Sequence, residues 1–236
     1  MTLTKVARKN VARKRAAKKI GRPRHQRGQA PQTRDRILRC AIREFSLQGY
    51  RGGRVQRIVN DARVTLRLIY HYFGGKEDLY LACLERVFVE IRRAEQELEL
   101  RALPPLEGMR KLIDFTFDHL RSRADFIGLV RSENQLGSKG VLGRSRLVPS
   151  LTAPILVVIQ DILERGCRQG VFRGDVDPVQ FFVTLQALCS VHISNRTTLS
   201  TILTTDLGDA AWLEARRAHL HEVLLAYLRQ PSRAHR

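Results

Sequence analysis

The stretch that decides the fold is "ARVTLRLIYHYFGGKEDLY", residues 62–80. It has a short polar start, a tight run of Leu, Ile, Tyr and Phe, a Gly-Gly break, and then Lys-Glu-Asp. This order is typical of a DNA-reading helix followed by the start of another helix. However, Leu66 and Leu68 stand where a reading helix usually has polar groups, and Arg63 stands where a turn usually has glycine. The stretch therefore indicates a working DNA-binding head, a degraded one, or a core helix.

The residues just before this stretch predict two more helical segments. Residues 33–50, "TRDRILRCAIREFSLQGY", carry apolar side chains at i, i+1, i+4, i+5 and i+8, the stripe of an amphipathic helix. Thr33 is the expected N-cap of this helix, and Gly49 is its expected left-handed C-cap. A second helix over about 54–61, the turn "ARV" and a third helix over 65–72 complete a helix-turn-helix.

The remainder of the chain predicts helices throughout, because no period-2 strand pattern and no tandem repeat occurs in it. Glycine and proline clusters separate these helices. The expected helices cover residues 76–101, 105–122, 124–136, about 146–169, 176–196 and 209–229. The predicted fold class is therefore all-α.

The formal net charge of the 236-residue chain is +19, and most of the excess lies at its start. Residues 1–34 hold 12 Lys or Arg and no Asp or Glu, whereas the remainder holds 30 basic and 23 acidic side chains. A dense basic tail indicates a polyanionic partner, with nucleic acid as the first candidate and a membrane surface as the second. No apolar run is long enough to cross a bilayer, so we expect no membrane span.

The basic tail, residues 1–32, has no sustained apolar face and no aromatic residue, so we expect it to be disordered when free. Within it, "KKIGRPRH" is similar to an AT-hook core, which offers Lys19, Arg22 and Arg24 to an A·T minor groove. The alternative is a polycationic arm that touches only phosphates. A transit peptide is also basic and poor in acidic residues, but this segment lacks serine.

The sequence contains no motif typical of an enzyme: no nucleophile elbow, no phosphate-cradling glycine loop and no HExxH. His219 and His221 are two apart on a predicted helix, so they face different ways and chelate one metal poorly. We therefore expect no catalytic residue, no cofactor and no metal. The cysteines have no zinc-site spacing and are expected to be buried thiols in a reducing cytosol: Cys40, Cys83, Cys167 and Cys189.

Residues 33–85 resemble the N-terminal domain of TetR-family transcriptional regulators. The most specific part of the resemblance is the spacing Ile69-Tyr70-x-x-Phe73-x-x-Lys76-x-x-Leu79. The resemblance implies a head that binds operator DNA as a homodimer, and a helical C-terminal domain that binds a small ligand which releases the DNA. After the basic tail over 1–32, the resemblance implies a helix-turn-helix DNA-binding domain over 33–79 and an effector-binding and dimerisation domain over 80–236.

The family pattern assigns DNA contact to positions in the second helix, the turn, the reading helix and the start of the fourth helix: Arg54, Gln56, Arg63, Thr65, Leu66, Arg67, Leu68, Tyr70, His71 and Lys76. Residues 66–68 face the bases, and Thr65 caps the reading helix and touches a phosphate. Tyr70, His71 and Lys76 contact backbone phosphates, although Tyr70 is alternatively a half-buried ring. Ile69 and Phe73 belong to the core.

Departures from the family pattern predict an unusual operator preference. Among the reading positions only Arg67 can hydrogen-bond a base edge, and guanine is its best partner. Leu66 and Leu68 can pack on thymine methyl groups. A left-handed Arg63 costs roughly 1 kcal/mol, which a phosphate contact can offset. Gly53 stands where a capping Thr or Ser is common, so we expect a weak start of the second helix.

In the body, polar side chains that continue apolar stripes are either satisfied core residues or ligand contacts. The candidates for a ligand pocket are Phe115, His119, Glu133, Asn134, Gln186 and His192. The family resemblance makes the last two predicted helices the expected dimer interface, through a wide apolar stripe. The alternative is that the protein is a monomer and the stripe is part of its core. On the final helix this stripe consists of Leu213, Leu220, Val223, Leu224, Tyr227 and Leu228.

The sequence thus predicts a cytoplasmic, nucleoid-associated regulator: a ligand-responsive repressor that binds a near-palindromic double-stranded DNA operator as a homodimer, with an effector of unknown identity and no membrane partner. A ligand-independent architectural protein that uses tail and head together is the first alternative, and a strong salt dependence without sequence preference would mark it. A basic RNA-binding or ribosome-associated protein is the second, and competition between RNA and duplex DNA would identify it.

Overall fold

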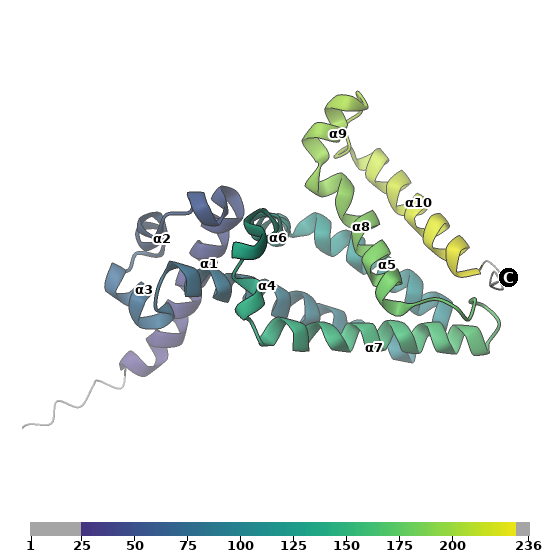
Figure 1. The fold of residues 1–236 in the computed structure, drawn as a ribbon, viewed down its shortest axis with the longest axis horizontal. Coiled ribbons are helices and arrows are strands. Elements are labelled where there is room, and N and C mark those ends of the chain that lie inside the picture. The colour runs from purple at the N-terminus through teal and green to yellow at the C-terminus, as the bar shows by residue number, and fades with distance from the viewer. Residues whose placement is uncertain (1–24, 230–236) are drawn as a thin grey trace, which may run out of the picture.

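The computed structural model describes residues 25–229, and this part of the chain is built from helices and turns without a strand. Figure 1 shows a small head at one end, formed by α1 to α3, and a longer helical body that extends away from it. The predicted all-α class is confirmed. Lys19, Arg22 and Arg24, the proposed contacts of the basic tail, lie outside the described residues.

The head consists of α1 (His25–Gly52), α2 (Val55–Ala62) and α3 (Leu66–Phe73). α1 begins at His25, so Thr33 is not its N-cap and residues 25–32 are helical where a disordered segment was expected. This stretch contains Pro31, which cannot donate a backbone hydrogen bond and disfavours a helix interior, so the local sequence does not explain the extension. Gly49, the expected left-handed C-cap, has φ 66° and ψ 174°, so its φ is positive but its backbone is not left-handed helical. It interrupts the helical backbone, and α1 continues to Gly52.

The body begins with α4 (Lys76–Gln96) and ends with α10 (Ala210–Arg229). Between them lie η1 (Leu100–Ala102), α5 (Pro105–Ser122), α6 (Ala124–Leu136), η2 (Gly137–Lys139), η3 (Leu142–Arg144), α7 (Leu147–Arg168), α8 (Pro178–Ser194) and α9 (Arg196–Ile202). The helices predicted over 105–122 and 124–136 have the predicted bounds. The short α9 was not predicted; it follows Asn195, where α8 ends one residue earlier.

The head and the body share one apolar core, which is continuous across α1, α4 and α6. The buried ring of Tyr80 on α4 stacks edge-on against Phe45 of α1, with 5.1 Å between centroids, and its hydroxyl donates to the carbonyl of Leu129 on α6. A Cβ atom on Gly128 would lie 2.4 Å from the Ser46 carbonyl oxygen, so α1 and α6 touch through their backbones. The head is therefore fixed to the body rather than hinged on a linker.

α7 corrects the expectation that no apolar run is long enough to span a bilayer. Within the described residues it is long and apolar enough by length and composition, and 28% of its most apolar window is buried. One such helix is weak evidence for a span, because helices of soluble proteins pass the same test.

The cysteines are free thiols, as expected, but not all of them are buried. Cys83 and Cys189 are buried, Cys40 is half-buried and Cys167 is exposed. Burial raises the pKa of Cys189 to about 12, so this thiol is protonated near neutral pH.

Candidate nucleic-acid interface and ligand pocket

The reading helix α3 divides into an inward and an outward face. Ile69 is fully buried and Phe73 nearly so, which confirms their predicted place in the core. Arg67 and His71 are exposed, and 56% of Tyr70 is exposed, so the half-buried alternative for this ring is wrong. The separation follows from helical geometry, because residues four apart lie on one face.

The positions that flank Arg67 differ from each other in exposure. Leu66 keeps 42% of its surface exposed, whereas Leu68 is half-buried. Thr65 occupies the N-cap position of α3, but its side chain makes no capping hydrogen bond. An exposed hydroxyl at a helix N-terminus is well suited to a phosphate, as are the free amides of that first turn.

The turn between α2 and α3 has the left-handed conformation that the family pattern predicts. Arg63 has φ 49° and ψ 53°, and its amide donates to the Asn60 carbonyl at 3.1 Å. The Val64 amide donates to the Val59 carbonyl, also at 3.1 Å, and closes the end of α2. Because Arg63 carries a Cβ in this region, it retains a backbone cost of about 1 kcal/mol. Its side chain is exposed.

The start of α2 is capped from another helix. Arg54 is the N-cap residue and makes no side-chain cap, but its amide donates to Glu44 of α1 at 2.9 Å. The Arg57 guanidinium donates to the same carboxylate at 2.8 Å. Burial acts to raise the pKa of Glu44, but the hydrogen bonds from Arg57 and Arg54 outweigh it and hold that pKa below its usual range. The expected weak start of α2 is therefore reinforced by Glu44.

Gly53 has a steric reason to lack a side chain. A Cβ at this position would lie 2.5 Å from the Phe45 ring and 3.0 Å from the Gly49 carbonyl oxygen. The close approach leaves no room for the Thr or Ser that is common at this position. Gln56, one turn later, is exposed, and its amide nitrogen donates to the Asn60 side chain at 3.2 Å.

Lys76 begins α4, as predicted, but is half-buried rather than free. Its ammonium lies 4.8 Å from the centroid of the Tyr50 ring, and burial lowers its pKa. Glu77 and Asp78 follow it in the first turn, and both pair with Arg144 of η3. Arg144 thus offsets the negative charge beside the predicted phosphate contact.

The predicted ligand residues are distributed over three helices rather than gathered around one cavity. Phe115 and His119 contact each other within α5 with tilted rings, 5.3 Å between centroids. Glu133 is buried and accepts from the Leu142 amide, whereas Asn134 is exposed. Gln186 is half-buried on α8.

His192 has the most unusual surroundings of these residues. It is buried, and its ring stacks on Phe117 of α5 at 5.3 Å and tilts against Trp212 of α10 at 5.6 Å. Neither ring nitrogen has a hydrogen-bond partner. Burial, with a smaller contribution from the charge of Arg216, lowers the pKa of His192 to about 4. The imidazole is therefore neutral near neutral pH.

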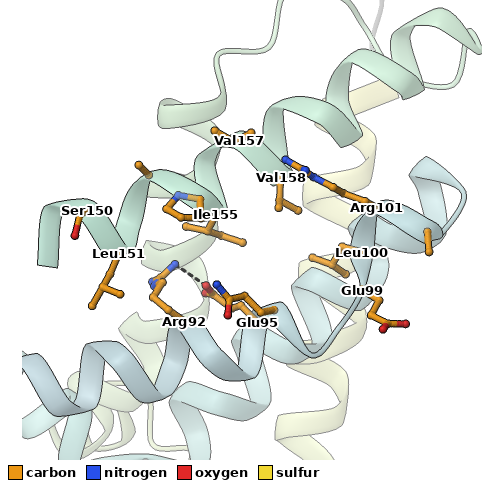
Figure 2. A pocket seen from close by; sticks show the side chains of 14 residues that line it. Arg92, Glu95, Glu99, Leu100, Arg101, Ser150, Leu151, Ile155, Val157 and Val158 are labelled. Atoms are coloured by element: carbon orange, nitrogen blue, oxygen red, sulfur yellow. Dashed lines mark hydrogen bonds and ion pairs between the residues drawn. The ribbon is translucent and has the colours of Figure 1, made fainter. Parts of the chain in front are cut away.

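A cavity of about 660 Å³ lies elsewhere, between the end of α4, η1 and α7, and is lined by none of the six predicted ligand residues. Figure 2 shows Arg92 and Glu95 of α4 beneath Ile155 of α7. Sequence reasoning missed both charged residues. Glu95 continues the buried stripe of Val87 and Ile91 at a spacing of four, a signal that resembles the ones that were followed.

Among residues 25–229, no group of three or more His, Cys, Asp or Glu side chains is placed to hold a metal ion. His219 is exposed, whereas His221 hydrogen-bonds Asp114 of α5 at 2.8 Å.

Two family models match the chain. The model of the bacterial regulatory proteins of the tetR family matches residues 37–83. The model of the tetracyclin repressor-like C-terminal domain matches residues 105–224. The first match contains α2, α3 and their turn, and the second contains most of the body.

Individual relatives agree with the family models. The chain is 35% identical over 190 residues to the HTH-type transcriptional repressor NicS of Pseudomonas putida, which covers 78% of this chain and 89% of NicS. A transcriptional regulator from Streptomyces coelicolor is similar in structure, with a TM-score of 0.62 and 27% identity. The match covers 84% of this chain and 99% of that regulator. FadR of Bacillus subtilis, solved in complex with stearoyl-CoA, matches with a TM-score of 0.61 at 17% identity. The match covers 82% of this chain and 98% of the FadR chain, and it shows a likeness of fold alone.

Proposed function

The chain belongs to the TetR family of bacterial transcriptional regulators and is a DNA-binding repressor, and on this premise we propose that it binds a near-palindromic operator as a homodimer and releases it on binding a small molecule. The proposal includes a cytoplasmic location at the nucleoid. One observation carries the proposed DNA contact: Leu66 and Arg67 of the reading helix are exposed while its core residues, Ile69 and Phe73, are buried.

In the proposed complex, α3 lies in the major groove. Arg67 reads guanine, and Leu66 packs on a thymine methyl group. Leu68 contributes less than Leu66, because its side chain is already half-buried against the head. The operator preference therefore depends mainly on Arg67 and Leu66.

Phosphate contacts in the proposed complex come from both sides of the reading helix. Thr65, Tyr70, His71 and Lys76 approach the backbone from α3 and the start of α4. Arg54, Gln56 and Arg63 approach it from α2 and the turn: all three side chains are exposed there. Such contacts set affinity and register but carry no sequence information directly.

A homodimer is supported by apolar side chains that the protomer leaves uncovered on α8 and α10. Val183 is 56% exposed on α8, and Val223 and Tyr227 are 41% and 40% exposed on α10. The predicted stripe on the last helix is divided: Leu220, Leu224 and Leu228 are buried inside the protomer. In the proposed dimer, the outward part packs against the same surface of a second copy, as a two-fold interface requires.

The basic tail favours a second candidate, an architectural protein that binds DNA without a ligand, because residues 1–34 carry 12 basic and no acidic side chains. Each cation that meets a phosphate steepens the dependence of affinity on salt. The two candidates differ in the ratio of operator affinity to random-DNA affinity, which an architectural protein keeps near one at every salt concentration.

The experiment that tests the proposal is genome-wide footprinting with the full chain, followed by fluorescence anisotropy on the mapped site. Arg67→Ala is expected to weaken operator binding about tenfold or more and to relax the preference for guanine. Arg110→Ala removes an exposed arginine from α5 of the body and serves as the matched control. Unchanged affinity of Arg67→Ala at a mapped operator would overturn the placement of the reading helix.

A further inference from the structure

We propose that the cavity between α4, η1 and α7 binds a small organic anion, whose apolar body fills the cavity and whose carboxylate or phosphate oxygens take the place of Glu95 on the guanidinium of Arg92. The claim that this ligand also controls DNA binding rests on the function proposed above, whereas the binding site itself does not.

The walls of the cavity suit an apolar molecule. Leu100 of η1 and Leu151, Ile155 and Val158 of α7 present aliphatic side chains to it, as Figure 2 shows. A volume of about 660 Å³ is within the range of small-molecule sites in proteins. Several of these α7 side chains remain partly exposed, so the walls are not closed by packing within the protomer.

The floor of the cavity carries an ion pair that the protein only partly satisfies. Arg92 donates to Glu95 at 2.6 Å, and both side chains are more than nine-tenths buried. The Arg92 Nε atom is buried without a hydrogen-bond partner. Buried polar groups normally have partners, and an unpartnered donor beside a cavity marks the place where an acceptor fits.

The chemistry of arginine selects the class of ligand. Its planar guanidinium has donors and no acceptor, and it binds carboxylates and phosphates through two parallel hydrogen bonds. A carboxylate that approaches from the cavity offers an acceptor to Nε, which Glu95 leaves unfilled. A cationic ligand is repelled by the same guanidinium. A neutral amide offers only one carbonyl acceptor and no countercharge, so it binds the guanidinium less strongly than a carboxylate does.

Glu95 is able to give up Arg92. Burial raises the pKa of this carboxyl to about 7, so near neutral pH it takes up a proton at little cost once its partner is engaged elsewhere. The other charged side chains at the cavity are Glu99, before η1, and Arg101, on η1; α7 lines it with Ser150 and apolar side chains but with no charged group. Binding of an anion is therefore accompanied by proton uptake at Glu95.

The test uses three probes with one apolar body and different head groups: 4-phenylbutyrate, 4-phenylbutyramide and 4-phenylbutylamine. Titration calorimetry on the full chain, in two buffers of different ionisation enthalpy, reports affinity and proton uptake together. We expect the acid to bind at least about tenfold more tightly than the amide and the amine, and to take up protons. Equal binding of the three probes, or no binding of the acid at millimolar concentration, would overturn the inference.

Variants assign the effect to the floor of the cavity. Arg92→Gln is expected to remove the preference for the acid, and Glu95→Gln to keep binding but lose the proton uptake. If Arg92→Gln does not fold, the double variant with Glu95→Gln removes both charges at similar volume. Arg110→Gln changes an exposed arginine of α5 that does not line the cavity and is the matched control. Retention of the preference in Arg92→Gln, or in the double variant, would contradict the proposal.

Anisotropy on the mapped operator separates this inference from the proposed function. Acid-selective binding that leaves operator affinity unchanged supports the binding site and overturns the proposed release of DNA. Specific operator binding without acid-selective binding to the cavity leaves the DNA-binding function intact and overturns the site.

Discussion

Glu44 of α1 accepts a hydrogen bond from the backbone amide of Arg54, the residue that precedes α2, at 2.9 Å. A side chain from a neighbouring helix thus performs the capping that the sequence next to α2 lacks. Gly53 precedes the N-cap residue, and a Cβ there would strike the Phe45 ring at 2.5 Å.

Removal of this cap is expected to lower the stability of the head. Glu44→Ala leaves the Arg54 amide and the Arg57 guanidinium without their acceptor, and the expected loss of unfolding free energy is about 1–2 kcal/mol. Urea denaturation measures it. Glu107→Ala removes an exposed carboxylate from the first turn of α5 and serves as the control. Equal losses in the two variants would show that Glu44 does not act as a cap.

The left-handed turn residue allows stability and DNA affinity to be separated. Arg63→Gly is expected to raise the unfolding free energy by about 0.5–1 kcal/mol, because glycine adopts φ 49° without the Cβ penalty. The same variant is expected to bind operator more weakly through loss of a phosphate contact. Arg63→Ala keeps the strained backbone and loses the charge, so it should bind operator more weakly without a gain in stability. A Gly variant less stable than the Ala variant contradicts the left-handed geometry.

The contact between head and body at Gly128 is expected to tolerate no added methyl group. In Gly128→Ala the added Cβ would lie only 2.4 Å from the Ser46 carbonyl oxygen, so α1 and α6 must separate. We expect a loss of about 1–3 kcal/mol, typical of overpacking, measured by thermal and urea denaturation. Gly143→Ala meets nothing within 4 Å and is the control. A stable Gly128→Ala protein is incompatible with the close approach of these helices.

His192 is expected to make stability depend on pH. Its pKa is about 4 in the folded protein against an ordinary value of 6.5, so its contribution is fully present above pH 6.5 and is lost as pH falls through 4. Glu95 acts in the opposite sense: its raised pKa of about 7 makes stability fall as pH rises from 4.5. The two effects overlap, so the test compares variants rather than one curve.

The comparison subtracts the pH profile of His192→Phe from that of the natural protein, with unfolding free energy measured by urea denaturation between pH 4 and 7. The variant has no histidine at this position to keep neutral. The unfolding free energy of the natural protein should therefore fall relative to that of the variant, and increasingly so as pH drops below 6.5. His219→Phe removes an exposed histidine from α10 as the control. A flat difference for His192→Phe would exclude a neutral buried imidazole at this site.

The exposed apolar surface of α8 and α10 predicts the effect of a charge on assembly. Val183→Asp is expected to weaken dimerisation at least about tenfold, because an unpaired carboxylate would be buried in the interface. Sedimentation at several concentrations measures it. Leu47→Asp changes a side chain of the head that is 71% exposed and should leave the dimer intact. If both variants remain dimeric, the interface lies elsewhere.

Much of the fold is predictable from sequence because its signals are local. The bounds of α5 and α6 follow from Pro104-Pro105 before α5, the glycines from Gly137 after α6, and the apolar spacing between them. The inward Ile69 and Phe73 follow in the same way from the helical period. The start of α1 was mispredicted, because residues 25–32 have no apolar stripe and contain Pro31, which locally disfavours a helix.

The ligand site was not predictable in the same way. His192 and Glu133 were chosen because they continue apolar stripes, and both are buried, but they lie apart from the cavity. The lining of the cavity joins residues 92–102 to residues 150–158, which no local pattern relates.

The sequence by itself determined the helical class, the frame of the reading helix and the departures at Arg63 and residues 66–68, because these depend on periodicity and on the identity of neighbouring residues. Only the tertiary structure decided that Glu44 caps α2 and that Arg92 and Glu95 form a buried pair beneath α7. The physical reason is that capping and burial depend on which distant backbone or side chain arrives at a given point, and packing between helices sets that arrangement.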